Sequence, residues 1–470
     1  MLNNLFKIHN SDNVTISLDD SKSFKRGFKY ANSKILKGKP ILKYGIQIGK
    51  ATTDIDINEE VHIHNMEYVP ANFNFSTTDK FDGEDVNTES KCLLYKNPHG
   101  GYATQKNILL ISSVSCVNGL ATEILHIYNG TTGPEDVRVL PLTNPSGCGH
   151  VSSGNDISIL RNLIQGYIDN PNCFGAIVLR LGCEDFQGKV NTKKPLFDIT
   201  FQENTSREEV ITKSREFINS ILNDIRSIKR QDVCSSNLII GLQCGGSDGL
   251  SAITCNPQLG IISDYHNSIG GKTILAETPE ILGSREWLLS RCEYENKLKL
   301  KQIFKNWDDG KNQFDNPSPG NISGGISNIF EKSLGSVLKG GTSKISGIIN
   351  YGDQLEQDSG LYFLDSPGYD PMSITGQIAA GANIICFTTG KGSSYQNSFT
   401  PVYKISSNTF LSNRINGLID FNAQDNMFSS TPELIKKMYK SILDFSSGNS
   451  KNRTFFNTND FIPWLKEGSN

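Results

Sequence analysis

A pair of histidines has the spacing of a metal or carboxylate site. His62 and His64 alternate in the segment Val-His-Ile-His-Asn. On a β-strand, residues two apart project to the same face, so both imidazoles could reach one metal ion or one carboxylate. The spacing leaves open the alternative that the two side chains are exposed without a ligand.

Four cysteines lie in polar, loop-like surroundings. They are Cys116 in Ser-Val-Ser-Cys, Cys148 in Ser-Gly-Cys-Gly-His, Cys183 in Gly-Cys-Glu and Cys244 in Gln-Cys-Gly-Gly. None belongs to a Cys-x-x-Cys pair, so a structural zinc site is not indicated. The four thiols could converge on a soft or borderline metal, or on an iron–sulfur cluster. They could equally be small buried residues, which is how free cysteines usually behave.

A glycine-rich segment follows the apolar run at residues 238–242. Gly245, Gly246, Ser247 and Asp248 offer free backbone N–H donors, a hydroxyl and a carboxylate close together. Such a nest suits an anionic ligand, and the aspartate suits a sugar hydroxyl or a metal. The segment has neither the Gly-Lys-Ser/Thr of a Walker loop nor the glycine spacing of the dinucleotide fingerprint.

Three more polar side chains stand in turns or at the ends of apolar runs. Glu277, in Ala-Glu-Thr-Pro-Glu, is a candidate acid or base, with a surface role as the alternative. Lys391, in Thr-Thr-Gly-Lys-Gly, could hold a carboxylate as a point charge or be solvated. Asn321 ends the rigid polar turn Asn-Pro-Ser-Pro-Gly-Asn.

The elements that must position these side chains follow one recurring pattern. An apolar run rich in β-branched residues ends in a cluster of Gly, Cys, Ser or Thr. The runs lie at residues 107–116, 174–184, 238–248, 273–280, 361–368 and 383–392. Continuous apolar runs favour parallel strands between helices, and ligands bind at the carboxyl ends of such strands. The predicted fold class is therefore α/β, with mostly parallel sheets in the larger lobes.

The domain organisation follows from shifts in composition. Residues 1–70 contain short isoleucine-rich clusters broken by glycines, which predicts a small β-rich domain. Residues 71–95 are polar and lack apolar periodicity, as linkers do. We expect a first α/β lobe over residues 96–260 and a second over residues 261–470.

Composition restricts the class of protein. The 470 residues include 46 basic and 49 acidic groups, so the formal net charge is -3, without the basic excess of a nucleic-acid binder. No apolar run approaches the length of a membrane helix, and the first residues lack the apolar stretch of a signal peptide. We expect a soluble, cytoplasmic protein whose ten cysteines are thiols, acting on a small molecule. The sequence leaves open whether it forms a homo-oligomer.

Several long blocks of sequence carry a family resemblance. They are KYGIQIGKA, VHIHN, SSVSCVNGLA, IVLRLGCE, GLQCGGSDGLSAITCNPQLG, ETPE, NPSPGNISGG with EKSLGS, and FTTGKGS. In this order they resemble the altronate and galactarate dehydratase family of sugar-acid lyases. The resemblance implies an N-terminal β domain of the SAF type on larger α/β lobes, and removal of water from an aldonic or aldaric acid. It also implies iron(II), or manganese(II) in its place.

The resemblance implies roles for particular residues. Metal binding is expected of His62, His64, Cys148, Cys183 and Cys244, and an iron–sulfur cluster is left open. Acid and base candidates are Glu184, Glu277 and His150. Substrate contacts are expected from Gly245, Gly246, Ser247, Asp248, Asn321 and Lys391, with the lysine as carboxylate anchor.

The sequence also departs from the family pattern. Asn144 stands where the family usually has a histidine shortly before the second cysteine loop, and His150 is a candidate substitute. The loop with Gln105 and Lys106 is altered as well. The His-x-His of VHIHN resembles the altronate branch, so D-altronate is the expected substrate. The alternatives are galactarate dehydration, release of sulfite from a sulfonated hydroxy acid, and sugar-acid binding without turnover.

Overall fold

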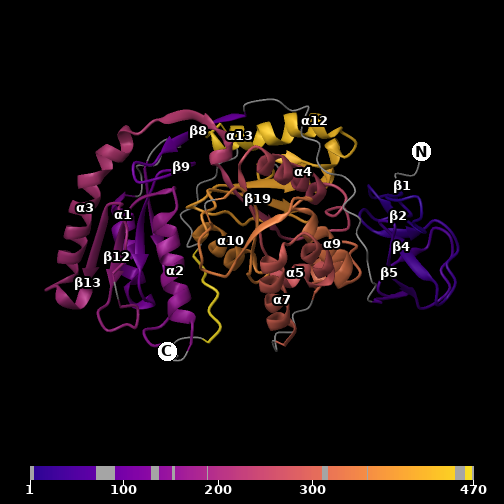
Figure 1. The fold of residues 1–470 in the computed structure, drawn as a ribbon, viewed down its shortest axis with the longest axis horizontal. Helices are drawn as coiled ribbons and strands as arrows, with labels where there is room; N and C mark the ends of the chain where they lie inside the picture. Colours follow the sequence, from indigo (N-terminus) through magenta and orange to yellow (C-terminus); the bar gives the residue numbers. More distant parts are fainter. Residues whose placement is uncertain are drawn as a thin grey trace.

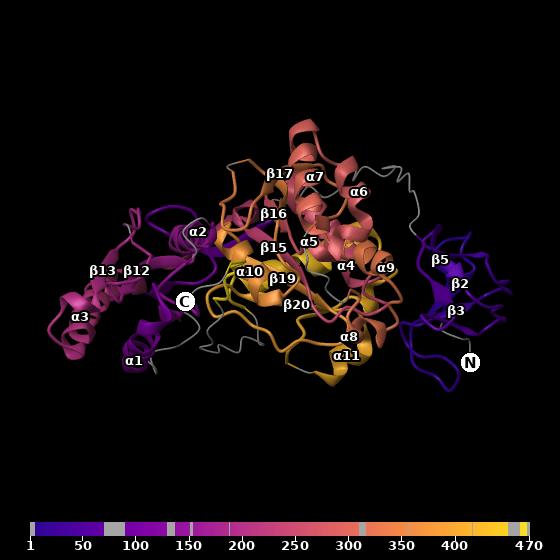
Figure 2. The same ribbon diagram turned by 90° about the horizontal axis from the view of Figure 1, so that it is seen from below.

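The computed structural model describes residues 5–69, 90–128, 137–150, 154–187, 189–309, 316–356, 358–415, 417–449 and 461–467. Figure 1 shows three parts: a small β-rich part at the N-terminus, an α/β lobe that follows it, and a larger α/β lobe. The two smaller parts lie on opposite sides of the larger lobe, as Figure 2 also shows. Within the described residues, no helix is both long and apolar enough to span a bilayer.

The N-terminal part consists of short antiparallel strands in two sheets. One sheet has the order β1-β2-β3-β6, with β1 at Leu5–Phe6, β2 at Val14–Ser17, β3 at Lys29–Ala31 and β6 at Glu60–Val61. The other has the order β4-β5-β7, with β4 at Pro40–Lys43, β5 at Ile46–Ala51 and β7 at Met66–Glu67. The β4–β5 turn has positive φ at both Tyr44 and Gly45, as a two-residue type I′ hairpin requires. The predicted β-rich N-terminal part is confirmed.

Most of the predicted linker at 71–95 lies outside the described residues. From Lys91 the chain forms β8 (Lys91–Lys96), the middle strand of a small antiparallel sheet. Its neighbours are β14 (Arg230–Cys234) and β9 (Tyr102–Ala103).

The next lobe contains a parallel sheet of order β11-β10-β12-β13. Its strands are β10 (Asn107–Ser112), β11 (Arg138–Leu142), β12 (Cys173–Arg180) and β13 (Leu196–Thr200). Its helices are α1 (Asn118–Tyr128), α2 (Asp156–Asp169) and α3 (Arg207–Ser227). Side chains of β10 alternate between two cores: Ile108 and Leu110 pack with α1 and α3, whereas Leu109 and Ile111 pack with α2.

The larger lobe is built on a seven-stranded parallel sheet of order β17-β18-β16-β15-β19-β20-β21. The strands are β15 (Ile239–Cys244), β16 (Lys272–Leu275), β17 (Ile345–Ile349), β18 (Gly360–Leu364), β19 (Ile384–Thr389), β20 (Val402–Ser406) and β21 (Phe421–Asn422). Strand β15 lies at the centre of this sheet, although the sequence-based division places residues 239–244 in the first lobe. All six apolar runs recognised in the sequence contain a strand of one of the two parallel sheets.

Helices cover both faces of the larger sheet. They are α4 (Cys255–Ser268), α5 (Thr278–Ile281), α6 (Arg285–Ser290), α7 (Tyr294–Asp309), α8 (Pro319–Ile322), α9 (Ile329–Leu338), α10 (Asp370–Ala379), α11 (Thr409–Arg414), α12 (Thr431–Leu434) and α13 (Lys440–Ser446). Short 3₁₀ turns lie at Ser115–Val117, Phe201–Glu203, Ser235–Asn237, Leu282–Ser284 and Gln424–Asn426, and a π-helical turn lies at Ile435–Tyr439.

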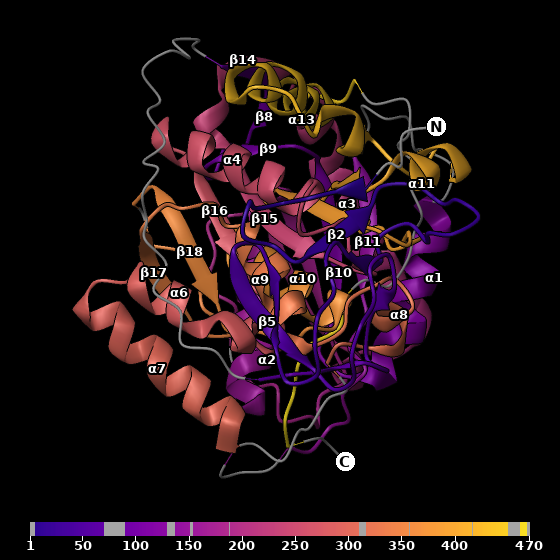
Figure 3. The same cartoon turned by 90° about the vertical axis from the view of Figure 1, so that its right-hand side faces the viewer.

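Two hydrophobic cores connect the larger lobe to its neighbours. On one face, α4 and α9 share a core with buried isoleucines of the N-terminal strands, such as Ile41 and Ile48. On the other face, α10 packs with α2, and Ile374 and Ile378 share a core with Leu160 and Leu163. Figure 3 shows the N-terminal strands in front of α9. The three parts therefore bury apolar surface together, which fixes their relative positions.

Candidate active site

A group of buried and partly buried polar side chains lies where the strand order of the larger sheet reverses. Strand β15 has β16 on one side and β19 on the other, and open parallel sheets bind ligands outside the carboxyl ends of strands at such a point. A cavity of ≈ 620 Å³ opens there. The side chains on its wall that can do chemistry are Cys244, Glu280, Asn321, Lys332 and Asp370.

Three side chains on or beside this wall could hold a metal ion. The sulfur of Cys244 and one carboxylate oxygen each of Glu277 and Glu280 all lie within 4.8 Å of one another. Cys244 ends β15, and the two glutamates flank the start of α5, directly after β16. Within the described residues this is the one group of three potential ligands with that spacing. Cys148, Cys183, His62 and His64 do not join it.

Glu277 is held behind the cavity wall. It is fully buried, and its backbone N–H donates to Ser366 Oγ at 3.0 Å. Its carboxylate accepts from Gln243 Nε2 at 2.7 Å and from Lys339 Nζ at 2.5 Å. Burial raises the pKa of Glu277 above its usual range, although the charge of Lys339 opposes this. A raised carboxyl pKa is typical of groups that exchange protons near neutral pH.

Lys332 carries a buried positive charge on the cavity wall. Its ammonium group pairs with Glu280 Oε2 at 2.5 Å and donates to Ser247 Oγ at 3.1 Å. Its side chain is only 3% exposed. Burial lowers the pKa of Lys332, but the neighbouring Cys244 and glutamates outweigh that effect and raise it. Lys332 therefore stays charged at neutral pH and can attract an anionic ligand.

Asp370 lies opposite this group, at the first residue of α10. Its Oδ1 accepts from Gln243 Nε2 at 2.9 Å, and the same nitrogen donates to Glu277. Ser373 Oγ donates to the side-chain oxygen Oε1 of Gln243 at 3.0 Å and so fixes which way the amide points. Burial raises the pKa of Asp370 to about 6, and the charge of Glu280 adds to the increase.

Two glycines lie at the cavity, and one of them lets the backbone approach Asp370 closely. A Cβ on Gly245 would lie 2.5 Å from Asp370 Oδ2 and 2.5 Å from Phe387 Cζ, so only glycine fits there. Gly246 has a φ of 64° and also lies on the cavity wall. The structure thus places both predicted substrate-binding glycines at the cavity.

The two polar residues that follow these glycines have different surroundings. The hydroxyl of Ser247 accepts from Lys332, as described above. The carboxylate of Asp248 is buried, and it accepts from Ser251 Oγ at 2.8 Å, Ser407 Oγ at 2.8 Å and Asn408 Nδ2 at 3.1 Å. Those bonds join the loops after β15 and β20, so in this structure the side chain of Asp248 fixes the glycine-rich loop.

Of the other two predicted substrate contacts, one reaches the cavity. Asn321 lies on its wall and donates from Nδ2 to the Ser247 carbonyl at 2.9 Å. Lys391 is exposed, and its ammonium group donates to Ser323 Oγ at 2.7 Å. The lysine that the structure brings to the cavity is Lys332 instead.

The two histidines lie in a turn after β6, so the shared face that a strand would give them does not form. His62 is buried, and its ring nitrogens lie 2.7 Å from Ser327 Oγ and 3.0 Å from the Ile322 carbonyl. His64 is exposed. Both nitrogens of His62 are thus bonded to the segment that follows Asn321, and a metal role for the pair stays a prediction.

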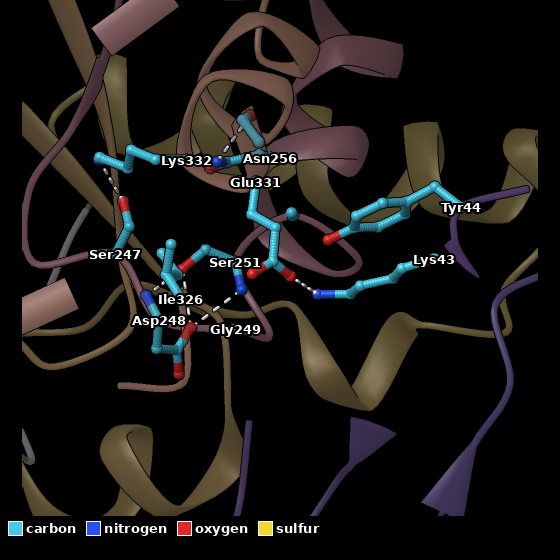
Figure 4. A pocket seen from close by; sticks show the side chains of 12 residues that line it. Lys43, Tyr44, Ser247, Asp248, Gly249, Ser251, Asn256, Ile326, Glu331 and Lys332 are labelled. Carbon is cyan, nitrogen blue, oxygen red and sulfur yellow. Dashed lines mark hydrogen bonds and ion pairs between the residues drawn. The ribbon is translucent and has the colours of Figure 1, made fainter. Parts of the chain in front are cut away.

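One buried carboxylate connects the N-terminal strands to helix α9, which also carries Lys332 of the cavity wall. Glu331 of α9 accepts from Lys29 at 2.8 Å and from Lys43 at 2.8 Å, and all three side chains are at most 2% exposed. Figure 4 shows Glu331 directed at Lys43, whereas the next residue, Lys332, extends toward Ser247. Burial alone would raise the pKa of Glu331, but the two lysines lower it to about 2. Glu331 therefore ties α9 to the N-terminal part.

Replacing Glu331 by Gln leaves Lys29 and Lys43 without their carboxylate in a buried interface. Breaking a buried ion pair in this way costs about 3–5 kcal/mol of unfolding free energy. We expect a loss of that size in urea unfolding at pH 7, followed by circular dichroism. Asp56→Asn is the matched control, because Asp56 pairs with Lys34 at an exposed position and should change the stability little.

The ion pairs of Glu331 with Lys29 and Lys43 should also make the stability of the wild-type protein depend on pH in the acid range. The folded-state pKa of Glu331 is depressed, so its contribution is complete above the ordinary value of 4.5 and is lost as the pH falls toward about 2. The Gln variant should lack this part of the acid transition. If Glu331→Gln leaves both the urea unfolding midpoint and the acid dependence of stability unchanged, the ion pairs of Glu331 contribute nothing to the free energy of unfolding.

The remaining predicted residues lie in the other α/β lobe. Glu184 is buried and accepts from Ser113 Oγ and from the backbone N–H of Gly182 at 2.6 Å. Burial would raise the pKa of Glu184, but these bonds lower it. Cys148 and Cys183 are exposed, and the backbone N–H of His150 donates to Asp185 Oδ2 at 2.7 Å. Among the residues of this lobe that the structure describes, none is on the wall of the cavity.

Sequence reasoning did not single out four residues of the cluster. They are Glu280, Lys332, Lys339 and Asp370. Glu280 belongs to the ETPE block and Lys332 to the EKSLGS block, whereas Lys339 and Asp370 lie outside the quoted blocks. Their positions in the sequence gave no sign of a shared site. Only the strand order of the folded sheet brings α5, α9 and α10 together.

Three family profiles match most of the chain. Residues 235–468 match the family profile described as "D-galactarate/Altronate dehydratase, C-terminal". Residues 94–226 match "D-galactarate dehydratase/Altronate hydrolase, second domain", and residues 17–69 match "Altronate/galactarate dehydratase SAF domain".

Three similar proteins come from two bacteria. The chain is 34% identical to the altronate dehydratase of Bacillus subtilis (strain 168), over 90% of each chain. It is 31% identical to the altronate dehydratase of Escherichia coli (strain K12), over 97% of each. It is 27% identical to the galactarate dehydratase (L-threo-forming) of the same strain, over 95% of this chain and 93% of that one.

Proposed function

The chain belongs to the altronate and galactarate dehydratase family, and from that premise we propose that it converts D-altronate to a 2-keto-3-deoxy acid and water. The observation that carries the proposal is the cavity at β15. Its wall brings together a buried lysine, two carboxyl groups and an asparagine, which is what binding and dehydrating a polyhydroxylated anion require.

The reaction sets the requirements for these residues. A base removes the proton from the carbon next to the substrate carboxylate, and the hydroxyl group on the following carbon leaves with a proton. The resulting enol tautomerises to the 2-keto-3-deoxy acid. Negative charge develops on the substrate carboxylate during the first step, so a fixed positive charge beside it stabilises the transition state.

Lys332 meets the requirement for positive charge. It is buried on the cavity wall and stays protonated, so it can pair with the substrate carboxylate as a point charge. Asn321 and Ser318 line the wall next to it and offer hydrogen bonds to the substrate hydroxyls.

Asp370 is the proposed general base, and Glu280 is the second carboxyl group on the wall. Asp370 has a pKa of about 6, so at neutral pH it is mostly ionised yet basic enough to take the proton. Glu280 lies on the wall with Lys332 and Cys244, where it pairs with the Lys332 ammonium group and is one of the three potential metal ligands, so no acid role is assigned to it. Glu277 supports them from behind through Gln243, which bonds to both Glu277 and Asp370.

Iron(II) is the proposed metal, with manganese(II) as an alternative. The donor set of Cys244, Glu277 and Glu280 fits such an ion in kind, because a thiolate and carboxylates both bind it, and in spacing. Lys332 and Lys339 bond to these glutamates here, so an ion would replace those contacts. When bound, it supplies Lewis-acid stabilisation of negative charge.

Turnover of a panel of sugar acids tests the proposal. The purified protein, supplied with iron(II) and a reductant, is incubated with D-altronate, galactarate and a sulfonated hydroxy acid, and 2-keto-3-deoxy acid and sulfite are measured. We expect the highest kcat/KM with D-altronate, and loss of activity when a chelator removes the metal. Faster turnover of either other acid would refute the substrate assignment. Binding of sugar acids without any turnover would refute catalysis.

A further inference from the structure

Three exposed cysteines gather at one edge of the smaller parallel sheet, outside the cavity. Cys116, Cys148 and Cys183 follow β10, β11 and β12, which are adjacent and parallel. These strands end at nearly the same level, since Ile111 pairs with Leu142 and Ser112 pairs with Leu179. The loops that carry the three thiols therefore leave the sheet side by side.

Hydrogen bonds join the three loops close to the cysteines. The backbone N–H of Ser115 donates to the Ser146 carbonyl at 3.0 Å, which links the first loop to the second. The backbone N–H of Asp185 donates to the carbonyl of Cys148 itself at 2.8 Å, which links the second to the third. Ser113 Oγ donates to the carboxylate of Glu184, which links the first to the third. Each cysteine thus lies within two residues of an interloop bond.

The residue that departs from the family pattern belongs to this framework. Asn144 is fully buried, and its Nδ2 donates to the Ser113 carbonyl at 2.8 Å. Asn118 donates from Nδ2 to the Asn144 carbonyl at 2.9 Å. Glu184 fixes the third loop by accepting from the Gly182 N–H. The asparagine and the glutamate therefore hold the loops in place, and the three cysteines on these loops are exposed.

The side chains at this edge have the chemistry of a metal centre. The three thiols are free rather than in disulfides. His150 lies two residues beyond Cys148, and both of its ring nitrogens are shielded from solvent without a hydrogen-bond partner in the described part of the chain. A buried imidazole with neither nitrogen bonded is costly unless a ligand satisfies it. Thiolates with or without an imidazole are the ligands of iron–sulfur centres.

The spacing of the three thiols does not fit a single shared metal ion. The ligand atoms of the three cysteines do not all lie within 4.8 Å of one another, as they would around one metal ion. A cluster has several irons, each with its own thiolate, and so accepts more widely spaced sulfurs. We propose that Cys116, Cys148 and Cys183 hold an iron–sulfur cluster, with His150 beside it. This centre is separate from the cavity and goes beyond the proposed function.

Iron and sulfide content test this proposal directly. The full-length protein is reconstituted under argon with ferrous iron, ferric iron and sulfide, and then desalted. We expect acid-labile sulfide in amounts similar to the bound cluster iron, with visible absorption from sulfur-to-iron charge transfer. A variant with Cys116→Ser, Cys148→Ser and Cys183→Ser should lose the sulfide and the absorption. Cys234→Ser is the matched control, because Cys234 is exposed but lies on β14.

A second measurement on the wild-type chain does not depend on how the variant folds. In the reconstituted protein, alkylation by iodoacetamide followed by mass spectrometry should modify Cys234 readily and leave Cys116, Cys148 and Cys183 protected. Alkylation of those three thiols as fast as Cys234 in the sulfide-loaded protein would overturn the proposal. Retention of iron without sulfide would do so as well. Neither readout uses turnover, so the outcome is independent of the proposed dehydratase activity.

Discussion

Replacing Asp370 by Asn is expected to lower kcat/KM for D-altronate about 10²- to 10⁴-fold, the usual contribution of a general base. The amide keeps the shape of the side chain and can still contact Gln243, but it cannot take a proton. The kcat should fall with little change in KM. Asp358→Asn is the control. Asp358 is exposed and precedes the amino end of β18, whereas the cavity lies at the carboxyl ends of the strands.

The pH profile gives an independent check of the same assignment. The base must be ionised, and burial raises the pKa of Asp370 to about 6. In the wild type, kcat/KM should therefore fall as the pH drops through about 6, rather than near the ordinary value of 3.8. The residual activity of Asp370→Asn should lack this limb. A variant that keeps the wild-type rate and acid limb would exclude Asp370 as the base.

Replacing Lys332 by Met is expected to have the second large effect. Truncating one partner of a buried, hydrogen-bonded charge pair costs about 2–5 kcal/mol, which corresponds to about 30- to 5,000-fold in affinity. Because Lys332 is proposed to hold the substrate carboxylate, the loss should be largest in KM and in the inhibition constant of a non-reactive sugar acid. Lys305→Met, on the exposed side of α7, is the matched control.

The comparison of Lys332→Met with Lys391→Met decides between two anchors. The sequence favours Lys391, which follows β19 beside glycines, whereas the structure brings Lys332 to the cavity wall and bonds Lys391 to Ser323. A larger rise in KM for Lys391→Met would show that the sequence-based assignment is the correct one. Circular dichroism of both variants checks that Met at the buried position 332 has not unfolded the chain.

Local sequence was sufficient to predict six of the eleven strands in the two parallel sheets. Continuous β-branched runs are buried on both faces, and this property depends only on neighbours along the chain. The six runs therefore identified parallel strands, and the clustered glycines identified the loops at their carboxyl ends. Gly245 and Gly246 were placed at a ligand site for the same local reason, since a close approach of the backbone needs a residue without a side chain.

Short-range sequence patterns did not show which side chains meet at the cavity. Glu280, Lys332 and Asp370 follow or precede different strands, and the strand order of the seven-stranded sheet alone brings them to one cavity. The same order separates Cys244 from Cys148 and Cys183, which lie on a different sheet. Histidine is a common metal ligand, but in the folded protein both ring nitrogens of His62 lie within hydrogen-bond distance of the segment after Asn321.

The sequence by itself determined the family, the α/β class and the positions of the strand-end loops, because repeated short-range patterns and long shared blocks specify them. Tertiary structure decided which loops share a cavity, which charges are buried together and which ligand types already have protein partners. Those properties depend on strand order and on packing between segments far apart in the chain, and both arise only when the chain has folded.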